Sequence, residues 1–371
     1  MNLGLSDEQE FLREAARGAL SRVKTIEAAR EALEGGELPD LWPTVVEAGW
    51  PGLLIAEDRG GAGLGAFDAM LVAEECGHVL AGAPLLGLLP ATALLQAGGD
   101  QSLEAVAAGE VRPAWLPARP PGDVVEGWTV DARTGKHRPS APAAVVNGDT
   151  VRFTGEVAWV PDAPGADVFV VVGVDEAGAP VVGVVDAADA TVEPIVRYDA
   201  TRTLGHVSLD GAAGRRVAVD ADDIARAWYL AQALLAAESV GAVAATLEMA
   251  VQYAKERFTF GRAIGSYQAI KHGLTEVLRR LENARSLLYF AGWAYADQPD
   301  QFALAASAAR SAAGRALDYA ARQNITTHGG IGATWEHDAP LFFRRAQLSR
   351  RLLGGTADAT DRVAEALLAA A

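Results

Sequence analysis

The feature that most constrains this chain is a run of helical periodicity from about Asp222 to its end. Apolar residues recur there at three- and four-residue spacing, which is the pattern of helices that bury one face in a bundle. Long helices are predicted over residues 224–257, 267–295, 301–327 and 358–370. This part of the chain is therefore expected to fold as a C-terminal helical bundle over residues 221–371.

Two segments with different sequence patterns precede the predicted bundle. Residues 1–111 are also helical in pattern, beginning with the capping box Ser6-Asp-Glu-Gln9 and continuing over 41–48 and 67–79. Residues 112–220 are rich in Val, Gly and Pro and alternate with period two, with a hairpin expected around Asn147-Gly148. The predicted fold class is α+β: an N-terminal helical domain (1–111), a middle antiparallel β-domain (112–220) and the C-terminal bundle (221–371).

Charge and composition narrow the classes of partner. The 371 residues carry a net charge of −16, which repels nucleic acid and anionic membranes, so neither nucleic-acid binding nor membrane insertion is expected. The most apolar stretch, 228–251, contains Glu238 and Glu248. The single Cys76 excludes an internal disulfide, and the N-terminus lacks the basic and apolar blocks of a signal peptide. These features predict a cytoplasmic protein.

One stretch, Glu256 to Lys271, separates two of the predicted helices and concentrates unusual chemistry in a single turn. Its glycines let the backbone approach a ligand, and Arg257 and Arg262 can meet phosphate charge. The aromatic residues and Gln268 suit a flat polar ring system. Composition alone leaves an ordinary helix junction as an open alternative.

The order of residues in this stretch, Glu-Arg-x-x-Phe-Gly-Arg-x-Ile-x-x-x-Gln, resembles the flavin-binding signature of the acyl-CoA dehydrogenase family. Other segments match the same family: Glu57-x-x-Gly-Gly-x-Gly63, Gly155-Glu-Val-Ala-Trp-Val-Pro-Asp-Ala163 and His328-Gly-Gly-Ile-Gly332. The resemblance covers nearly the whole chain. It implies the acyl-CoA dehydrogenase fold and oxidation of an acyl-CoA thioester to its 2,3-enoyl form.

The resemblance also implies FAD as cofactor. In the family, a carboxylate removes the α-proton while the β-hydride passes to the flavin. The residues that fall on family flavin positions are Arg257, Thr259, Phe260, Tyr267, Gln268, Trp159, Gly329, Gly330 and Thr356. Two segments depart from the family pattern: Thr326 replaces a usual Gln, and Trp115-Leu-Pro-Ala-Arg-Pro-Pro-Gly122 replaces a Thr-Glu-Pro-x-x-Gly-Ser loop.

The catalytic base departs further from the family. The usual Glu of a Glu-Gly-Thr segment corresponds to Gly354, and the alternative family position falls near Ala231. Neither can take a proton. Glu238, the only acid between Trp228 and Thr246, is either a buried base or a structural acid paired with an Arg.

Other acids are weaker candidates for the base. Asp358 and Glu336 lie outside any catalytic motif, and His337-Asp338 beside Glu336 lacks a third metal ligand at credible spacing.

Taken together, these departures resemble a subunit of the actinobacterial acyl-CoA dehydrogenases that work as α2β2 heterotetramers, including those that act on steroid side chains. That resemblance implies a second dehydrogenase-like chain that supplies the catalytic carboxylate, an acyl-CoA substrate and an electron-transfer flavoprotein as acceptor. Two alternatives stay open. The chain is a self-sufficient homo-oligomer using Glu238 or Asp358, or it is a structural or regulatory subunit without flavin.

Overall fold

A computed structural model describes residues 4–120, 123, 141–195 and 198–369. Its first part is helical, with α1 opening on the predicted capping box: Ser6 Oγ accepts from the Gln9 backbone and the Gln9 side chain accepts from the Ser6 backbone. The helices of this part are α1 (Asp7–Leu20), α2 (Thr25–Leu33), α3 (Trp42–Glu47), α4 (Ala66–His78), α5 (Leu85–Ala97) and α6 (Leu103–Ala107).

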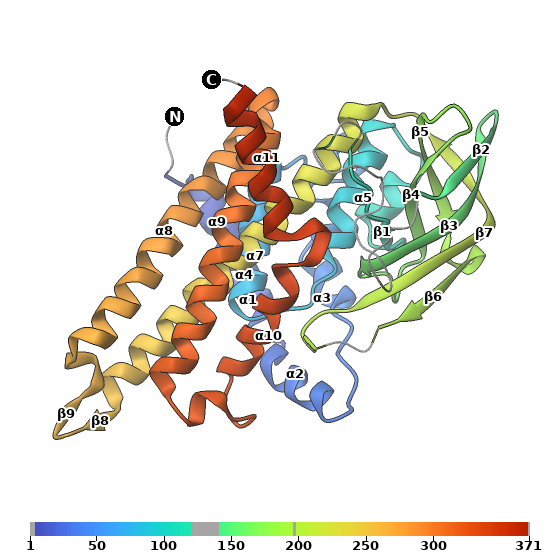
Figure 1. The fold of residues 1–371 in the computed structure, drawn as a ribbon. Helices are drawn as coiled ribbons and strands as arrows, with labels where there is room; N and C mark the ends of the chain where they lie inside the picture. Colours follow the sequence, from blue (N-terminus) through green and yellow to red (C-terminus); the bar gives the residue numbers. More distant parts are fainter. Residues whose placement is uncertain (1–3, 121–122, 124–140, 196–197, 370–371) are drawn as a thin grey trace.

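The middle part is a β-barrel, drawn at the right of Figure 1. Strands β4, β5, β7, β3 and β2 pair in a closed ring, with β1 added beside β4 and β6 beside β7. The strands are β1 (Pro113–Trp115), β2 (Ala143–Asn147), β3 (Thr150–Pro161), β4 (Val168–Val174), β5 (Pro180–Asp186), β6 (Ala190–Pro194) and β7 (Leu204–Val217). The hairpin predicted at Asn147-Gly148 is confirmed as the β2–β3 turn.

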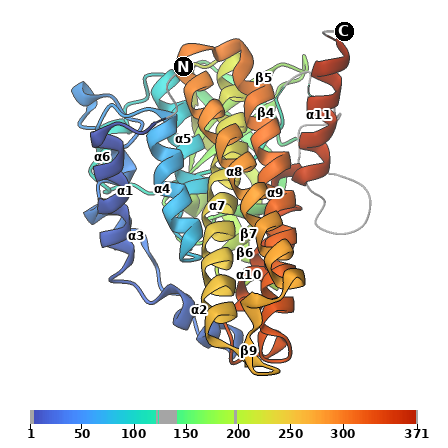
Figure 2. The ribbon, with the colours of Figure 1, turned by 90° about the vertical axis from the view of Figure 1, so that its left-hand side faces the viewer.

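The last part is a bundle of long helices (Figures 1 and 2). The bundle consists of α7 (Ala221–Glu256), α8 (Gln268–Asp297), α9 (Pro299–His328), α10 (Ala339–Ser349) and α11 (Gly355–Ala369); a short hairpin, β8 (Phe258–Thr259) with β9 (Arg262–Ala263), joins α7 to α8. The predicted order of helical, β and helical parts is confirmed. The structure changes type between Ala107 and Pro113 and again between Val217 and Ala221, while the domain boundaries themselves stay predictions. Ala370, at the end of the last predicted helix, lies outside the described residues.

Alternation along β4 divides the hydrophobic core in two. Phe169 and Val171 point into the barrel, whereas Val170 and Val172 pack on the helices, because successive side chains of a strand face opposite ways. The helices of the first and last parts share one continuous cluster, which places the barrel against the side of the bundle.

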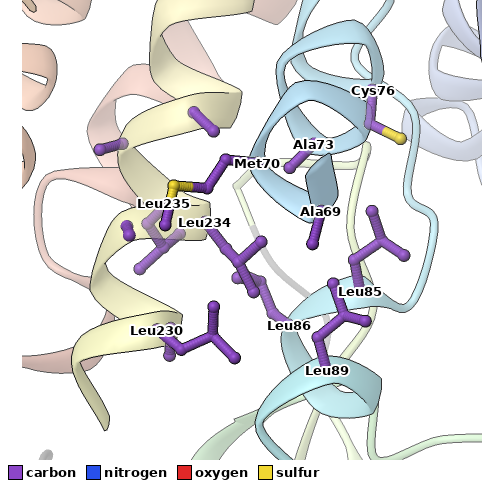
Figure 3. Packing of buried hydrophobic residues seen from close by; sticks show 14 of the residues in the cluster. Ala69, Met70, Ala73, Cys76, Leu85, Leu86, Leu89, Leu230, Leu234 and Leu235 are labelled. Atoms are coloured by element: carbon purple, nitrogen blue, oxygen red, sulfur yellow. The ribbon is translucent and has the colours of Figure 1, made fainter. Parts of the chain in front are cut away.

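Two helices cross at the centre of this shared core. Met70 of α4 points toward Leu234 and Leu235 of α7 (Figure 3). At the crossing, a Cβ on Gly77 would overlap the Glu238 carbonyl, and a Cβ on Gly241 would overlap the Glu74 carbonyl. The two backbones therefore touch. α7 has the length and composition of a membrane span, yet 72% of its most apolar window is buried among other parts of the protein.

Candidate functional site

The stretch singled out in the sequence forms a tight hairpin at one tip of the bundle (Figure 1). Two contacts fix its shape: the Tyr267 hydroxyl donates to the Thr259 carbonyl at 2.9 Å, and the Arg262 guanidinium lies 4.1 Å from the Tyr267 ring centroid. Phe260 at the turn has φ of +53°, a left-handed conformation that bulky residues rarely adopt. The hairpin is thus held rigid while its turn residue is strained.

The hairpin presents its aromatic and polar groups outward. Phe260 is 93% exposed and Phe258 is 64% exposed, and Arg257 and Gln268 are also on the surface. Two neighbouring exposed Phe rings are costly in water unless another surface covers them. The geometry therefore matches a surface that meets a ligand or a second chain.

The glycine-rich segment lies at the same end of the bundle, just after α9 ends at His328 (Figures 1 and 2). Among the residues that the structure describes, no atom beyond the adjoining residues comes within 4 Å of a Cβ built on Gly329 or Gly330, so the backbone here faces open space. Ile331 and Trp335, which follow, are 47% and 72% exposed. The structure thus brings the hairpin and this segment to one open end, and Thr326 is exposed there as well.

Trp159 lies elsewhere, in the barrel. It occupies a bulge of β3 with φ of +58°, and its ring packs edge-on against His206 at a centroid distance of 5.3 Å. Figure 1 shows the barrel and the β8–β9 hairpin at opposite sides of the molecule. One chain therefore does not bring Trp159 together with the hairpin residues.

The segment around Gly354, predicted from the sequence to stand in place of the catalytic Glu, connects α10 to α11. Leu353, Gly354 and Gly355 all have positive φ, of +52°, +78° and +75°. The turn is held from the bundle, because the Gln232 side chain donates to the Leu353 carbonyl at 3.1 Å. Arg310, fully buried, donates to the carbonyls of Ser349 and Leu352, and burial lowers its pKa to about 10.

Thr356 is the second residue of α11, directly after this turn. Its backbone N–H donates to the Arg350 carbonyl at 3.1 Å, and its methyl group would collide with any side chain on Gly314. This N–H is therefore already used within the chain.

Four charged side chains form a connected set, and two of them, Arg119 and Asp358, lie next to Gly354. Arg119 contacts Asp358 at 2.5 Å and Asp123 at 3.0 Å, and Arg362 contacts Asp123 at 2.5 Å. We call this set the Arg119 network. Burial alone would raise the pKa of Asp123, but the hydrogen bonds and charge of Arg362, with those of Arg119, hold it below its usual value.

An aromatic side chain forms the other wall of the Arg119 network. The guanidinium carbons of Arg119 and Arg362 lie 5.5 and 5.4 Å from the Trp228 ring centroid. Trp115 packs edge-on against the same ring at 6.3 Å. The loop that departs from the family pattern thus supplies Trp115 and Arg119 to this filling; its last two residues, 121 and 122, lie outside the described part.

A side chain at Gly354 has no room. A Cβ built there lies 2.6 Å from Asp358 Oδ2 and 3.0 Å from an Arg119 nitrogen. Contacts that short require both charged groups to move. The position predicted from the sequence to correspond to the family's Glu therefore lies against an internal ion pair.

Glu238 lies in a second buried group of charges. Its carboxylate pairs with Arg202 and lies 3.7 Å from Arg345, which in turn contacts Asp199 at 3.0 Å. All four side chains are at least 96% buried. This pairing is the structural arrangement considered for Glu238, joining the linker before β7 to α7 and α10.

The other base candidates are placed as follows. Ala231 is fully buried within α7, Asp358 belongs to the Arg119 network, and Glu336 is exposed near the glycine-rich segment.

Asp162, at the Asn position of the family's β-domain motif, is a buried acid with a testable consequence. Burial raises its pKa to about 6, against the attraction of Arg202 and a hydrogen bond from the Gly87 N–H. The folded chain therefore holds this proton more tightly than the unfolded chain, and stability falls as pH rises from 3.8 to about 6. We expect Asp162→Asn to raise the free energy of unfolding by about 1–3 kcal/mol at pH 7.5.

Urea unfolding across pH 4 to 8 measures this effect. The gain in Asp162→Asn has to shrink as pH falls from about 6 toward 4, because the native acid then becomes protonated in the folded and the unfolded state. Asp210→Asn, an exposed change on β7, serves as the control and should leave the profile unchanged. A constant gain at every pH would contradict the prediction.

Comparison with known proteins shows which family has this arrangement. Residues 6–118 match the acyl-CoA dehydrogenase N-terminal domain, and residues 224–368 match the acyl-CoA dehydrogenase C-terminal domain. The chain is 33% identical over 367 residues to the acyl-CoA dehydrogenase IpdE2 of Mycolicibacterium smegmatis, covering 94% of this chain and 96% of that protein. The chain belongs to the acyl-CoA dehydrogenase family.

Solved structures agree with that assignment. A variant of the Tcur3481-Tcur3483 steroid ACAD superposes with a TM-score of 0.85 at 27% identity, covering all of both chains. The ChsE4-ChsE5 complex from Mycobacterium tuberculosis gives a TM-score of 0.85 at 25% identity and 99% coverage of each chain. The predicted family and fold are confirmed, and membership makes this chain part of a flavin-using class of oxidoreductases.

Proposed function

We propose that this chain is the subunit of a heteromeric acyl-CoA dehydrogenase that faces the flavin but lacks the base, while a partner chain supplies the catalytic carboxylate. The observation that carries the proposal is the Arg119 network beside Gly354. The Arg119–Asp358 ion pair of 2.5 Å lies against the position where a side chain on Gly354 would begin. Glu238, the buried acid of α7, is paired with Arg202.

The residues at the open end fit a flavin shared with another chain. Arg257 and Arg262 offer positive charge to a pyrophosphate, Gly329 and Gly330 leave room for close approach, and the exposed Phe260 offers an apolar face. When bound, FAD would supply the hydride acceptor for α,β-dehydrogenation of an acyl-CoA thioester. In this chain Thr259, Tyr267 and Gln268 would orient the cofactor, whereas Trp159 and Thr356, which also fall on family flavin positions, would contact FAD away from the hairpin.

The named relatives support the finer part of the proposal. Two neighbours of known structure are heteromeric by name, and one of these is a steroid ACAD. We infer an acyl-CoA substrate for the assembly, with fatty acyl and steroid side-chain thioesters as the classes to test. An electron-transfer flavoprotein as acceptor and a cytoplasmic location complete the proposal.

Copurification tests it directly. The chain is expressed alone and then together with an acyl-CoA dehydrogenase-like chain encoded next to it, and flavin absorbance and acyl-CoA-dependent dye reduction are measured. The lone chain should be colourless and inactive, and the complex should be yellow and active. An active yellow lone chain favours the homo-oligomer, whereas a colourless complex favours a subunit without flavin.

A second prediction concerns the hairpin. Phe260→Ala should lower the flavin retained per complex after gel filtration, because it removes an almost fully exposed apolar ring from the proposed cofactor face. The expected weakening is about tenfold in FAD affinity, by analogy with the loss of an aromatic contact. The control is Val145→Ala, which truncates a 60% exposed residue on the barrel and should leave retention unchanged. Equal retention in both variants would remove Phe260 from the cofactor face.

A further inference from the structure

Three aromatic rings join the two segments proposed to meet the flavin. Tyr253 lies on α7 just before the hairpin, and His328 is the last residue of α9, just before Gly329. Their ring centroids are 4.3 Å apart and the ring planes are inclined by 34°. His337 also packs against His328. Their ring centroids are 4.3 Å apart and the ring planes are inclined by 51°.

Hydrogen bonds assign the protons on both imidazoles. His328 Nδ1 is 2.8 Å from the Asn324 carbonyl, which can only accept, so Nδ1 of His328 carries the hydrogen. His337 Nδ1 is 3.0 Å from the Ala339 backbone N–H, which can only donate, so Nδ1 of His337 is unprotonated. Ala339 is the first residue of α10, and His337 therefore caps that helix with a nitrogen lone pair.

Most of the groups around His337 disfavour a proton there, and Glu336, the acid that precedes it in the chain, is exposed and screened by solvent. A proton on His337 would remove the cap of α10 and place a positive charge at a helix N-terminus, where the helix dipole disfavours it. It would also approach His328 from α9 and Arg30 from α2. Asp338, next in the chain, is the opposing acid, and its carboxylate is already paired with Arg30. Tyr253 lies beyond His328 and is not in contact with His337 by ring stacking.

We propose that the Tyr253–His328–His337 stack positions the glycine-rich segment against the hairpin, and that protonation of His337 releases residues 329–338 from that position. Only the consequence for flavin rests on the function proposed above. The positioning itself rests on the stack, the cap and the Arg30 contact. His328 and His337 are therefore positioning residues, since neither is argued to touch the reacting atoms.

The direction of the pH effect follows from the same contacts. Burial, His328 and Arg30 lower the pKa of His337 below 6.5. The neutral form is favoured in the fold, so the ordered segment is fully present above the unfolded pKa of about 6.5 and is lost as pH falls through the lower folded value. Mild acid is thus expected to loosen the segment while the rest of the bundle stays folded.

Hydrogen exchange measured by mass spectrometry tests the proposal without flavin or turnover. Exchange of peptides covering 326–339 in the copurified complex, corrected for the intrinsic pH dependence, should rise several-fold between pH 7.5 and 5.5. In His337→Asn the rise should vanish, since an amide oxygen can accept from Ala339 but does not titrate. The control is His78→Gln. It removes a histidine of α4 that pairs with Glu248 of α7, and it should keep the wild-type rise in exchange. A His337→Asn profile that follows the wild type overturns the proposal.

Two further measurements keep the test decisive. If His337→Asn does not fold, 13C-labelled histidine in the wild-type complex replaces it: the His337 resonance has to titrate together with the exchange of 326–339, and separate transitions overturn the proposal. Flavin absorbance is then followed over the same pH range. A colourless complex with the exchange profile intact contradicts the proposed function alone, whereas a yellow complex without that profile contradicts this inference alone.

Discussion

Gly354→Ala is expected to destabilise the chain by about 3 kcal/mol or more. The backbone at Gly354 has φ of +78°, and the added methyl group would lie 2.6 Å from Asp358 and 3.0 Å from Arg119. To relieve that overlap, the Asp358 carboxylate and the Arg119 guanidinium have to shift within a largely buried ion pair, which weakens their contact. Urea or thermal unfolding of the wild type and the variant measures the difference.

Gly211→Ala is the matched control for the backbone. Gly211 also has positive φ, of +64°, but in the described part of the chain no atom outside the adjoining residues lies within 4 Å of a Cβ built there. This change should cost only about 1 kcal/mol, the usual cost of a side chain in the left-handed region. Equal losses at Gly354 and Gly211 would show that the Arg119 network does not occupy the position of the family's Glu.

Gly354→Glu extends the same experiment to function. Restoring the family residue should not make the lone chain an active dehydrogenase, because the carboxylate cannot enter the space filled by Arg119 and Asp358. Dehydrogenase activity gained by the lone variant would contradict the division of labour between the two chains.

Glu238→Gln is expected to lower stability by about 3–5 kcal/mol, because it leaves Arg202 buried without its acid. In the copurified complex, the folded fraction should nevertheless turn over acyl-CoA at the wild-type rate per flavin. The two effects separate because stability depends on the ion pair, while the proposed base belongs to the partner chain.

A double-mutant cycle isolates the role of the pair. Arg202→Met combined with Glu238→Gln removes both charges, and the double variant should be more stable than the sum of the single losses predicts. Turnover per flavin that falls by orders of magnitude in Glu238→Gln, at unchanged substrate affinity, would instead assign the base to this chain.

The sequence predicted the order of the fold well because each part has its own periodicity. The long helices after Asp222 and the hairpin at Asn147-Gly148 follow from local patterns, and both are present. The closure of the barrel did not follow, since β2 meets β4 at the single pair Ala143 and Val174. The region 1–111 was predicted as helical, but the bounds of α5 within it were not assigned, because apolar residues lie on all sides of this helix and leave no polar face to show its period.

The site divides in the same way. The hairpin and glycine-rich residues lie in short contiguous motifs, and the structure places both groups at one end of the bundle. The Arg119 network has no such local signal, because Arg119 and Asp358 are 239 positions apart, as are Asp123 and Arg362. Pairing of this kind depends on tertiary packing and cannot be obtained from the spacing of residues in one sequence.

The contact between the backbones of α4 and α7 determines the order in which parts of this protein can pack during synthesis. Gly77 packs on the Glu238 backbone and Gly241 on the Glu74 backbone, so this face of α4 stays uncovered until the ribosome has synthesised most of α7. Until then the apolar face around Met70 lacks its partner residues Leu234 and Leu235. The N-terminal helices and the barrel thus emerge first but complete their packing late, and a nascent chain that stops before Gly241 exposes surface that invites chaperone binding or aggregation.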